Sequence, residues 1–402
     1  MNGTDLPFAP LKLKRDEERR LRAGHLWVYS NEVDTAATPL SGFEPGQPVE
    51  ILAHNGRVLG TGYVNPRSLI CARLLSRDPQ HPVSRSLLVH RLKVALALRE
   101  SIYDKPYYRL AFGDSDFLPG LIVDRYGDVL VAQLTTAGME RMKAEVVAAL
   151  EKVVKPRAIL LRNDSPIRAM EGLENYVEPA LGAVPEAVEL EENGVRFLAP
   201  LLSGQKTGWF YDHRENRARL MRYVRGRRVL NLFSYLGGWG VQAVVAGASE
   251  VVCVDASAGA LERLVENAAL NGVAERVTVR AGDAFDVLRS LREAREKFDV
   301  VVLDPPAFIK RKKDMAQGVQ AYRRLNQMAM QVLAPDGLLV SASSSFHLPR
   351  ETLLQAMLQA SRHLERGMQV LEQGHQAPDH PVHPAIPETA YLKAFFARVL
   401  PA

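Results

Sequence analysis

The sequence predicts an α/β protein with a doubly wound, mostly parallel sheet in its C-terminal half, preceded by a small β-barrel module and a central α+β domain. Two observations predict this fold class. From about residue 188 onward, short segments rich in branched apolar residues alternate with longer segments of helical periodicity. Before residue 77, short β-prone segments instead follow one another between Gly, Pro and Asn turns.

Length and composition set the frame for these elements. The chain has 402 residues, too many for one ordinary hydrophobic core, so we expect several domains. We predict the boundaries 1–77, 78–187 and 188–402. Hydrophobic residues make up 47% of the chain and charged residues 24%, which is typical of a globular protein and excludes wholesale disorder.

The N-terminal stretch predicts one short helix and several strands. Residues 17–23 are charged and helix-prone, and Gly24 is suited to end that helix. The β-prone segments, which predict the small barrel, are residues 26–29, 48–52, 58–64 and 69–74.

The central stretch predicts helices and strands but no catalytic constellation. A helix is expected over 87–102, and a hairpin within 113–133 turns at Tyr126-Gly127-Asp128. A second helix over 139–153 and strands at 158–161 and 176–179 complete this part. We therefore predict a connecting or docking domain.

The C-terminal stretch predicts the parallel sheet, whose ligands bind at the carboxyl ends of the strands. Its predicted strands are residues 229–233, 250–255, 277–280, 298–304 and 337–341. Its predicted helices are residues 240–246, 258–270, 285–297 and 319–332.

Three successive strand ends carry a pattern suited to a nucleoside-containing ligand. The first opens into a glycine-rich turn, residues 231–240, where backbone can approach a ligand closely. Asp255 ends the second strand, where an acid can accept hydrogen bonds from ribose hydroxyls, although a helix cap with Ser257 is the structural alternative. Asp283 follows the third and could accept the adenine amino group. An NAD-binding domain competes, but Gly-x-Gly-x-x-Gly is absent.

The fourth strand ends in Asp304-Pro305-Pro306-Ala307-Phe308. Two prolines impose a rigid extended turn that can aim the Asp304 carboxylate and neighbouring carbonyls at a flat base. Phe308 is a candidate for stacking on that base, and packing beneath the turn is the alternative. We therefore predict the acceptor side of the site here rather than a sharp structural loop.

Together with the run 205–217 and the tail 377–393, these motifs resemble the bacterial 23S rRNA (cytosine-C5)-methyltransferase I family and its guanine-methylating relatives. The resemblance spans nearly the whole chain. It implies an N-terminal PUA-like RNA-binding domain, a central domain and a Rossmann-like methyltransferase domain that uses S-adenosylmethionine. It also implies that residues 206–212 form a lid over the cofactor. The implied cofactor-binding residues are Lys206, Thr207, Phe210, Asp212, Arg214, Asn231, Phe233, Gly237, Gly238, Asp255, Ser257, Asp283 and Ala284.

One position departs from the family pattern. Methylation of cytosine C5 proceeds through addition of a cysteine thiolate to C6, and the resemblance places that nucleophile where this chain has Ser344. A hydroxyl needs an activating base, whereas a thiol near pKa 8.5 ionises readily. His347 is a candidate for that base, but we favour its interpretation as an ordinary loop histidine. Both cysteines, Cys71 and Cys253, are interpreted as packing residues.

Three hypotheses follow from this departure. The first is cytosine-C5 methylation by an unusual route. The second is transfer to a base nitrogen, for which Asp304, Pro305, Pro306 and Phe308 orient the acceptor without a covalent adduct. The third is an RNA-binding protein that has kept its cofactor pocket and lost turnover.

Charge and context complete the expectations about partners. Basic residues cluster at 12–22, 214–228 and 310–324, which fits contacts with rRNA phosphates, in the 23S molecule or an assembly intermediate. In the PUA-like domain we expect Lys12, Lys14, Arg15, Arg20 and Arg22 to make such contacts. We expect no metal, membrane span or secretory signal, hence a cytoplasmic protein, and by family analogy a homodimer.

Overall fold

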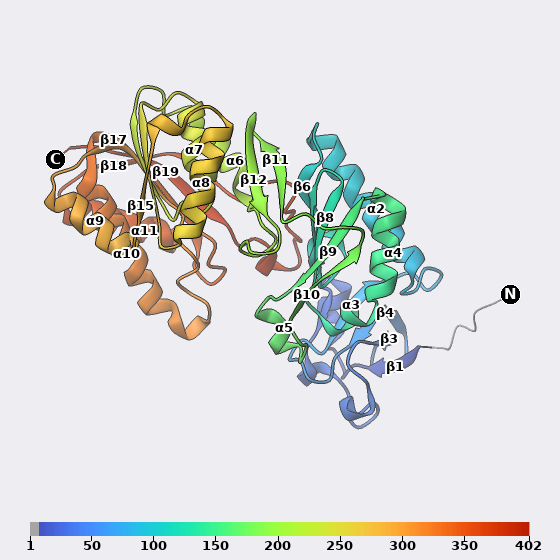
Figure 1. Ribbon diagram of the computed structural model, residues 1–402. Coiled ribbons are helices and arrows are strands. Elements are labelled where there is room, and N and C mark those ends of the chain that lie inside the picture. Colours follow the sequence, from blue (N-terminus) through green and yellow to red (C-terminus); the bar gives the residue numbers. More distant parts are fainter. Residues whose placement is uncertain (1–7, 402) are drawn as a thin grey trace. The chain divides into compact units, whose positions relative to one another are not determined.

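The computed structural model describes residues 8–401, and the chain divides into two compact units, each described by itself (Figure 1). The first unit comprises Met1–Val188, Pro200–Trp209 and Asp379–Thr389. The second comprises Glu189–Ala199, Phe210–Pro378 and Ala390–Ala402.

The N-terminal part of the first unit is a five-stranded sheet in the order β1-β3-β4-β5-β2. Its strands are β1 (Ala9–Lys12), β2 (Trp27–Val28), β3 (Gln47–Leu52), β4 (Val58–Val64) and β5 (Ala72–Ser76). Between β1 and β3 lie the short helix α1 (Arg19–Arg22) and two 3-10 turns, η1 (Ser30–Glu32) and η2 (Leu40–Gly42). The predicted small β module is confirmed. Strand β1 was missed because its alternation is interrupted by Pro10.

The central part carries a second five-stranded sheet in the order β10-β9-β8-β7-β6. Its strands are β6 (Tyr107–Phe112), β7 (Leu121–Tyr126), β8 (Val129–Leu134), β9 (Ala158–Asn163) and β10 (Tyr176–Leu181). Its helices are α2 (Arg85–Ile102), α3 (Ala137–Arg141), α4 (Lys143–Val154) and α5 (Ile167–Met170), with the 3-10 turn η3 (Gly113–Asp116). The predicted hairpin is present, with Tyr126 opposite Val129. The single helix predicted over 139–153 is divided at Met142.

Strand β4 of the N-terminal sheet meets helix α3 of the central part at a close contact between Tyr63 and Gly138. The Tyr63 hydroxyl donates to the Pro119 carbonyl at 2.9 Å and also bonds to Thr136. The Tyr63 ring lies against the backbone of Gly138, where a Cβ atom would fall 2.0 Å from the ring. Only glycine therefore fits this position without displacing the ring.

We predict that Gly138→Ala lowers the free energy of unfolding by about 1–3 kcal/mol, because it overpacks this contact. The matched control is Gly259→Ala, in a helix where an added Cβ meets nothing within 4 Å. That change should be neutral or stabilising by up to about 1 kcal/mol, because alanine favours helix. Urea unfolding of both variants measures the difference. Equal stabilities would contradict the assigned contact.

The second unit is built on a seven-stranded sheet in the order β15-β14-β13-β16-β17-β19-β18. Its strands are β13 (Arg228–Leu232), β14 (Glu250–Asp255), β15 (Val277–Ala281), β16 (Phe298–Leu303), β17 (Leu333–Ser343), β18 (Met368–Gly374) and β19 (Lys393–Val399). Its helices are α6 (Arg214–Met221), α7 (Gly238–Val245), α8 (Ala258–Leu270), α9 (Ala284–Glu293), α10 (Met315–Val332) and α11 (Arg350–His363). The hairpin β11 (Ala187–Glu192) and β12 (Val195–Pro200) precedes them. Its short turns are η4 (Tyr211–His213), η5 (Ala274–Arg276) and η6 (Lys312–Asp314), whereas η7 (Pro387–Thr389) belongs to the first unit.

This sheet confirms the predicted mostly parallel α/β fold. The strands from β15 to β17 pair in parallel, and β19 and β18 extend the sheet in antiparallel pairing. The central strands are almost wholly buried, and their apolar side chains pack against α9, α10 and α11. The two antiparallel strands were not predicted. Within residues 8–401, no helix is long and apolar enough to cross a membrane.

Candidate functional site

Four parallel strands of the second unit end at one edge of the sheet. Leu232 at the end of β13 pairs with Val254 of β14 and with Leu303 of β16. Asp255 pairs with Ala281 of β15. The residues that follow these strands therefore lie along one edge in the order Asp283, Asp255, glycine-rich turn, Asp304.

The glycine-rich turn after β13 is strained and tightly held. Phe233, Tyr235 and Gly237 all have positive φ, at 60°, 47° and 87°. The Ser234 hydroxyl bonds to the carbonyls of Asn231 and Val254, at 2.8 Å and 3.0 Å. Two non-glycine residues in the left-handed region cost on the order of 1–3 kcal/mol each, and such strain clusters at functional sites.

Gly237 and Asn231 shape the space beside this turn. A Cβ atom on Gly237 would approach Leu264 and Val241 to 2.8 Å, so no larger residue fits. Gly238 begins α7 directly after it. Asn231 is fully buried, and among residues 8–401 its Oδ1 atom has no hydrogen-bond partner. The backbone at Gly237 and Gly238, which we call the backbone cradle, therefore lies near a buried hydrogen-bond acceptor, an arrangement suited to a polar ligand.

Asp255 joins the second strand end to the turn. Its Oδ2 accepts from the Tyr235 amide and its Oδ1 from the Ser257 amide, both at 2.9 Å. Ser257 in turn caps α8 by accepting from the Ala260 amide at 3.2 Å. The structural role that the sequence allowed for Asp255 is therefore present. Each carboxylate oxygen can still accept a second hydrogen bond from a ribose hydroxyl.

Asp283 caps the next helix. Its Oδ1 accepts from the amides of Phe285 and Asp286, at 2.9 Å and 3.3 Å, and its side chain is exposed. Ala284, the first residue of α9, is buried behind it. Adenine recognition by Asp283 stays a prediction.

Asp304 is held between two side chains that the sequence analysis did not select. His213 Nε2 lies 3.1 Å from its Oδ1, and Trp239 Nε1 donates to its Oδ2 at 3.0 Å. The His213 and Trp239 rings also contact each other, with centroids 5.2 Å apart. Burial works to raise the pKa of Asp304, but His213 and Trp239 outweigh it and the net pKa is lowered. The group therefore stays a carboxylate acceptor at neutral pH.

His213 and Trp239 lay inside motifs that the sequence analysis had quoted. His213 belongs to the run 205–217 and Trp239 to the glycine-rich turn. Nothing in one sequence indicated that both turn toward the carboxylate after β16. Their residue type gave no signal, because each motif contains other aromatic residues.

The side chains of Phe210, Asp212 and Arg214 lie within the second unit. The Phe210 ring meets Tyr235 of the glycine-rich turn edge-on, with centroids 5.4 Å apart. Asp212 is buried and accepts from the Tyr391 hydroxyl at 2.6 Å. Arg214 is also buried, with its guanidinium over the Tyr211 ring. Phe210 is thus the member of this group that contacts the predicted cofactor turn.

Lys206 and Thr207 belong to the first unit. Thr207 is fully buried, its hydroxyl donates to Asp124, and the Tyr126 hydroxyl donates to its carbonyl at 3.1 Å. Lys206 is exposed and has a positive φ of 49°. A lid formed by residues 206–212 stays a prediction.

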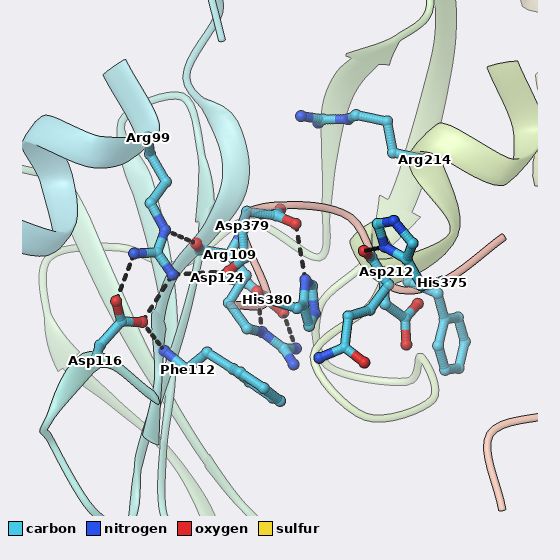
Figure 2. Close-up of polar contacts among 12 residues, drawn as sticks. Arg99, Arg109, Phe112, Asp116, Asp124, Asp212, Arg214, His375, Asp379 and His380 are labelled. Atoms are coloured by element: carbon cyan, nitrogen blue, oxygen red, sulfur yellow. Dashed lines mark hydrogen bonds and ion pairs between the residues drawn. The ribbon is translucent and has the colours of Figure 1, made fainter. Parts of the chain in front are cut away.

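An ion-pair network in the first unit fixes the tail motif of the family resemblance. Figure 2 shows the Arg99 guanidinium donating hydrogen bonds to both carboxylate oxygens of Asp116. Arg109 forms an ion pair with Asp124 in the same way. Asp379 accepts from the Arg109 amide at 2.9 Å, and its own carbonyl accepts from Arg99 at 2.7 Å. The tail segment beginning at Asp379 is therefore anchored to the central domain, a role that had not been predicted for that domain.

The acceptor loop after β16 and the serine loop after β17 are tied together by Tyr322. The Ser343 hydroxyl donates to the Tyr322 hydroxyl at 2.8 Å, which also bonds to Ser345 at 2.9 Å. Ser345 Oγ accepts from the Ile309 amide at 3.3 Å. Ser344 is half-buried at the centre of this loop.

Pro305, Pro306 and Phe308 form the other part of the acceptor loop. Pro305 is buried and Pro306 is exposed. The Phe308 ring packs on Tyr322 with centroids 4.8 Å apart, so the packing role is present. Stacking of Phe308 on a base stays a prediction.

Neither cysteine can act as a nucleophile at this site. Cys253 is buried within β14 against α7, where a Cβ on Gly240 would fall 2.5 Å from its sulfur. Burial raises the pKa of Cys253 and of Cys71 to about 12. Both thiols are therefore protonated at neutral pH, and their interpretation as packing residues fits the structure.

Lys393 supports the serine loop from beneath. It is buried, and its Nζ donates to the carbonyls of Ser345 and Leu348 at 2.6 Å and 2.7 Å. Burial, with a smaller contribution from Arg350, lowers the pKa of Lys393 to about 8.

We predict a pH-dependent stability difference between the wild type and Lys393→Met. An unfolded lysine titrates near pH 10.4, so between about pH 8 and 10 the unfolded chain binds more protons than the folded one. Wild-type stability should rise over that range relative to the variant, by up to about 1.4 kcal/mol per pH unit. Chemical unfolding at several pH values measures this.

The matched control is Lys297→Met, an exposed lysine whose amine also donates to a carbonyl, that of Gln331 at 2.7 Å. The stability difference for Lys393→Met should change more steeply with pH than the difference for this control. Equal curves for the two variants would contradict the lowered pKa of Lys393.

Comparison with known proteins places the chain in a class. An S-adenosylmethionine-dependent methyltransferase family model matches residues 172–398, and a PUA-like domain model matches residues 11–77. A structure of SMU.776, a proposed methyltransferase complexed with SAH, superposes with a TM-score of 0.83 at 20% identity, covering 97% of this chain and 100% of that one. A proposed SAM-dependent methyltransferase from Streptococcus mutans gives 0.81 at 21% identity, with the same coverage. The chain is an S-adenosylmethionine-dependent methyltransferase with a PUA-like domain.

Full-length relatives narrow this class. Ribosomal RNA large subunit methyltransferase I of Salmonella arizonae is 37% identical over 100% of both chains. The proteins of that name from Shewanella denitrificans and Escherichia coli O1:K1 are 37% and 36% identical over 97% of this chain and 99% of theirs. The chain therefore belongs to the ribosomal RNA large subunit methyltransferase I family, a family of S-adenosylmethionine-dependent RNA methyltransferases.

Proposed function

We propose that this protein transfers the methyl group of S-adenosylmethionine to a base of 23S rRNA, free or within an assembly intermediate, in the cytoplasm. The family supports the substrate and the reaction class. The observation that carries the proposal is the sheet edge in the second unit. It aligns a close backbone cradle, the acceptor Asp255 and the carboxylate of Asp304 along one line.

The residues at this edge fit the cofactor. Gly237 allows the positive φ that the turn requires, and Asp255 is half-buried with acceptor capacity remaining. We propose that the cofactor contacts this edge also through further residues, namely Asn231, Phe233, Gly238, Phe210 and the two helix caps Ser257 and Asp283. The sulfonium of the cofactor supplies an activated methyl group, so the protein has chiefly to orient the acceptor and exclude water.

The acceptor side is suited to a group that donates hydrogen bonds. Asp304 is held as a carboxylate by His213 and Trp239, and Pro305 and Pro306 have no amide hydrogen to donate. A flipped base that presents an N–H there can donate to the Asp304 carboxylate. Ser344, at the position where the resemblance places a thiol, favours a second candidate, transfer to a base nitrogen without a covalent adduct.

Two broader expectations accompany this proposal. The division into 1–77, 78–187 and 188–402 assigns RNA binding, docking and catalysis to successive parts of the chain. A homodimer, expected by family analogy, is tested by sedimentation velocity, in which a purely monomeric protein would contradict it.

The proposal is tested by comparing rRNA nucleoside masses from strains with and without the gene. We expect one methylated 23S base to disappear in its absence and to return with the wild-type gene. Unchanged masses together with intact cofactor binding by calorimetry would favour a protein that binds RNA and cofactor without turnover.

We predict that Asp255→Asn raises the Kd for S-adenosylmethionine by about tenfold or more. The change removes the negative charge and replaces one carboxylate oxygen, which accepts hydrogen bonds, by an amide NH2 group, which donates them. The matched control is Asp299→Asn. Asp299 also accepts a backbone amide, that of Arg228 at 2.8 Å, but it lies near the start of β16, at the opposite edge of the sheet. Calorimetry should give an unchanged Kd for the control. Equal affinities for both variants would remove Asp255 from the cofactor site.

We predict that Ser344→Ala retains methylation within about threefold. Within residues 8–401 no side chain is hydrogen-bonded to the Ser344 hydroxyl to activate it, and a nitrogen acceptor needs no adduct. RNA carrying 5-fluorocytosine should form no covalent complex with the wild type in denaturing gels. A complex that forms with the wild type and is lost in Ser344→Ala would instead establish C5 methylation through the serine.

A further inference from the structure

Two of the three basic clusters in the sequence are partly compensated by acids in the folded protein. In the arginine-rich segment 214–228, Arg217 pairs with Glu192, Arg222 with Glu372, and Arg228 with Glu250 and Glu296. In the segment 12–22, the ion pairs are Arg19 with Asp16, Arg20 with Glu32 and Arg22 with Glu18. Most arginines of these two segments are therefore paired, although within residues 8–401 some basic residues of each have no acidic partner, namely Lys12, Lys14, Arg15, Arg225 and Arg227.

The third cluster keeps its charge. It lies on residues 310–324 and is formed by the exposed side chains of Lys310, Arg311, Lys312, Lys313, Arg323 and Arg324. Across the part of the chain that the structure describes, Lys310, Lys312, Lys313 and Arg323 have no acidic partner. Arg311 pairs with Asp314 at 3.2 Å. The stretch 310–332 has Asp314 as its one acid and carries a formal charge of +5, equal to the excess of the whole chain.

This basic surface is fixed directly beside the acceptor loop. The chain runs from the exposed Pro306 to Lys310 in four residues, which span at most about 14 Å. Ile309 is buried and donates its amide to Ser345. Gly318 of α10 (orange in Figure 1) packs on the Ile309 side chain, where a Cβ would fall 2.1 Å away. The lysines therefore lie on a short segment held at both ends.

Arg324 extends the surface toward the cofactor edge. Its guanidinium lies 5.3 Å from the centroid of the Phe285 ring, two residues after Asp283. The Phe285 ring in turn lies 6.5 Å from Phe308 of the acceptor loop. Arg324 thus adds a further cation near the acceptor loop.

We infer that this surface, Lys310–Lys313 with Arg323 and Arg324, binds the phosphates of the single-stranded RNA that flanks the target nucleotide. The inference rests on the proposed function, because a base that reaches the acceptor loop brings its own backbone to this segment. Lysines on a short exposed turn act as point charges for phosphates and read no sequence. The surface therefore contributes RNA affinity and positions the RNA strand, and the acceptor loop determines which base is methylated.

The test compares two double variants with the same loss of charge. Lys312→Gln with Lys313→Gln removes two cations of the surface. Lys93→Gln with Lys152→Gln removes two exposed lysines of the first unit, from α2 and α4. Among residues 8–401 none of these four side chains forms a hydrogen bond or an ion pair, so both double variants should fold as the wild type does.

We expect the surface variant to bind 23S rRNA from a strain lacking the gene about tenfold more weakly at physiological salt. Its slope of log affinity against log salt should fall by about 1.4, since each contact with single-stranded phosphate contributes about 0.7. The KM for RNA should rise while kcat and the Kd for S-adenosylmethionine stay unchanged. The control should keep the wild-type slope. Identical slopes for both variants would overturn the inference.

Binding to poly(U) separates this inference from the proposed function. If wild-type protein methylates no 23S rRNA, the proposed function fails. A poly(U) slope that is still reduced only in the surface variant would keep the RNA-binding surface. An unchanged poly(U) slope would reject the surface, whatever the methylation result.

Discussion

The parallel hydrogen bonding of β13 with β14 and β16 is the constraint on which the second unit depends. Parallel pairing brings the carboxyl ends of these strands to one edge, so the residues after them are neighbours although they are far apart in sequence. The strands are almost wholly buried between helices, which holds the register against slipping. Without this register, Asp255 could not reach the Tyr235 amide, and Trp239 could not reach Asp304.

This rigid sheet supports local conformations that would not persist alone. Phe233 and Tyr235 adopt positive φ in adjacent turns, and Ser234 and Asp255 supply the hydrogen bonds that hold them. The serine loop is held in the same way by Tyr322 and the buried amine of Lys393. Burying that amine costs free energy, which other interactions of the fold must offset. The loop around Ser344 thus keeps a supported geometry.

The order of charged residues in the sequence does not show which of them form ion pairs in the folded protein. Arginines that cluster in the sequence at 214–228 meet Glu192, Glu250, Glu296 and Glu372, none of which lies in that segment. The cations at 310–313 keep their charge because the helix that follows, α10, contains no acid. Exposed ion pairs contribute little to stability, but they cancel the local field that attracts a polyanion. Pairing, rather than the number of basic residues, therefore distinguishes a structural cluster from a candidate RNA surface.

The sequence by itself determined the fold class, most central strands, the glycine-rich turn and the acids that end β14 and β16. These features depend on local periodicity and on glycine and proline geometry, which a single segment carries. It also contained the serine at the expected nucleophile position. It did not reveal β18 and β19, the break at Met142, or the roles of His213, Trp239, Tyr322 and Lys393. Only the tertiary structure decided those. Each depends on contacts between segments that are distant in the chain, and the local periodicity of a sequence carries no information about such contacts.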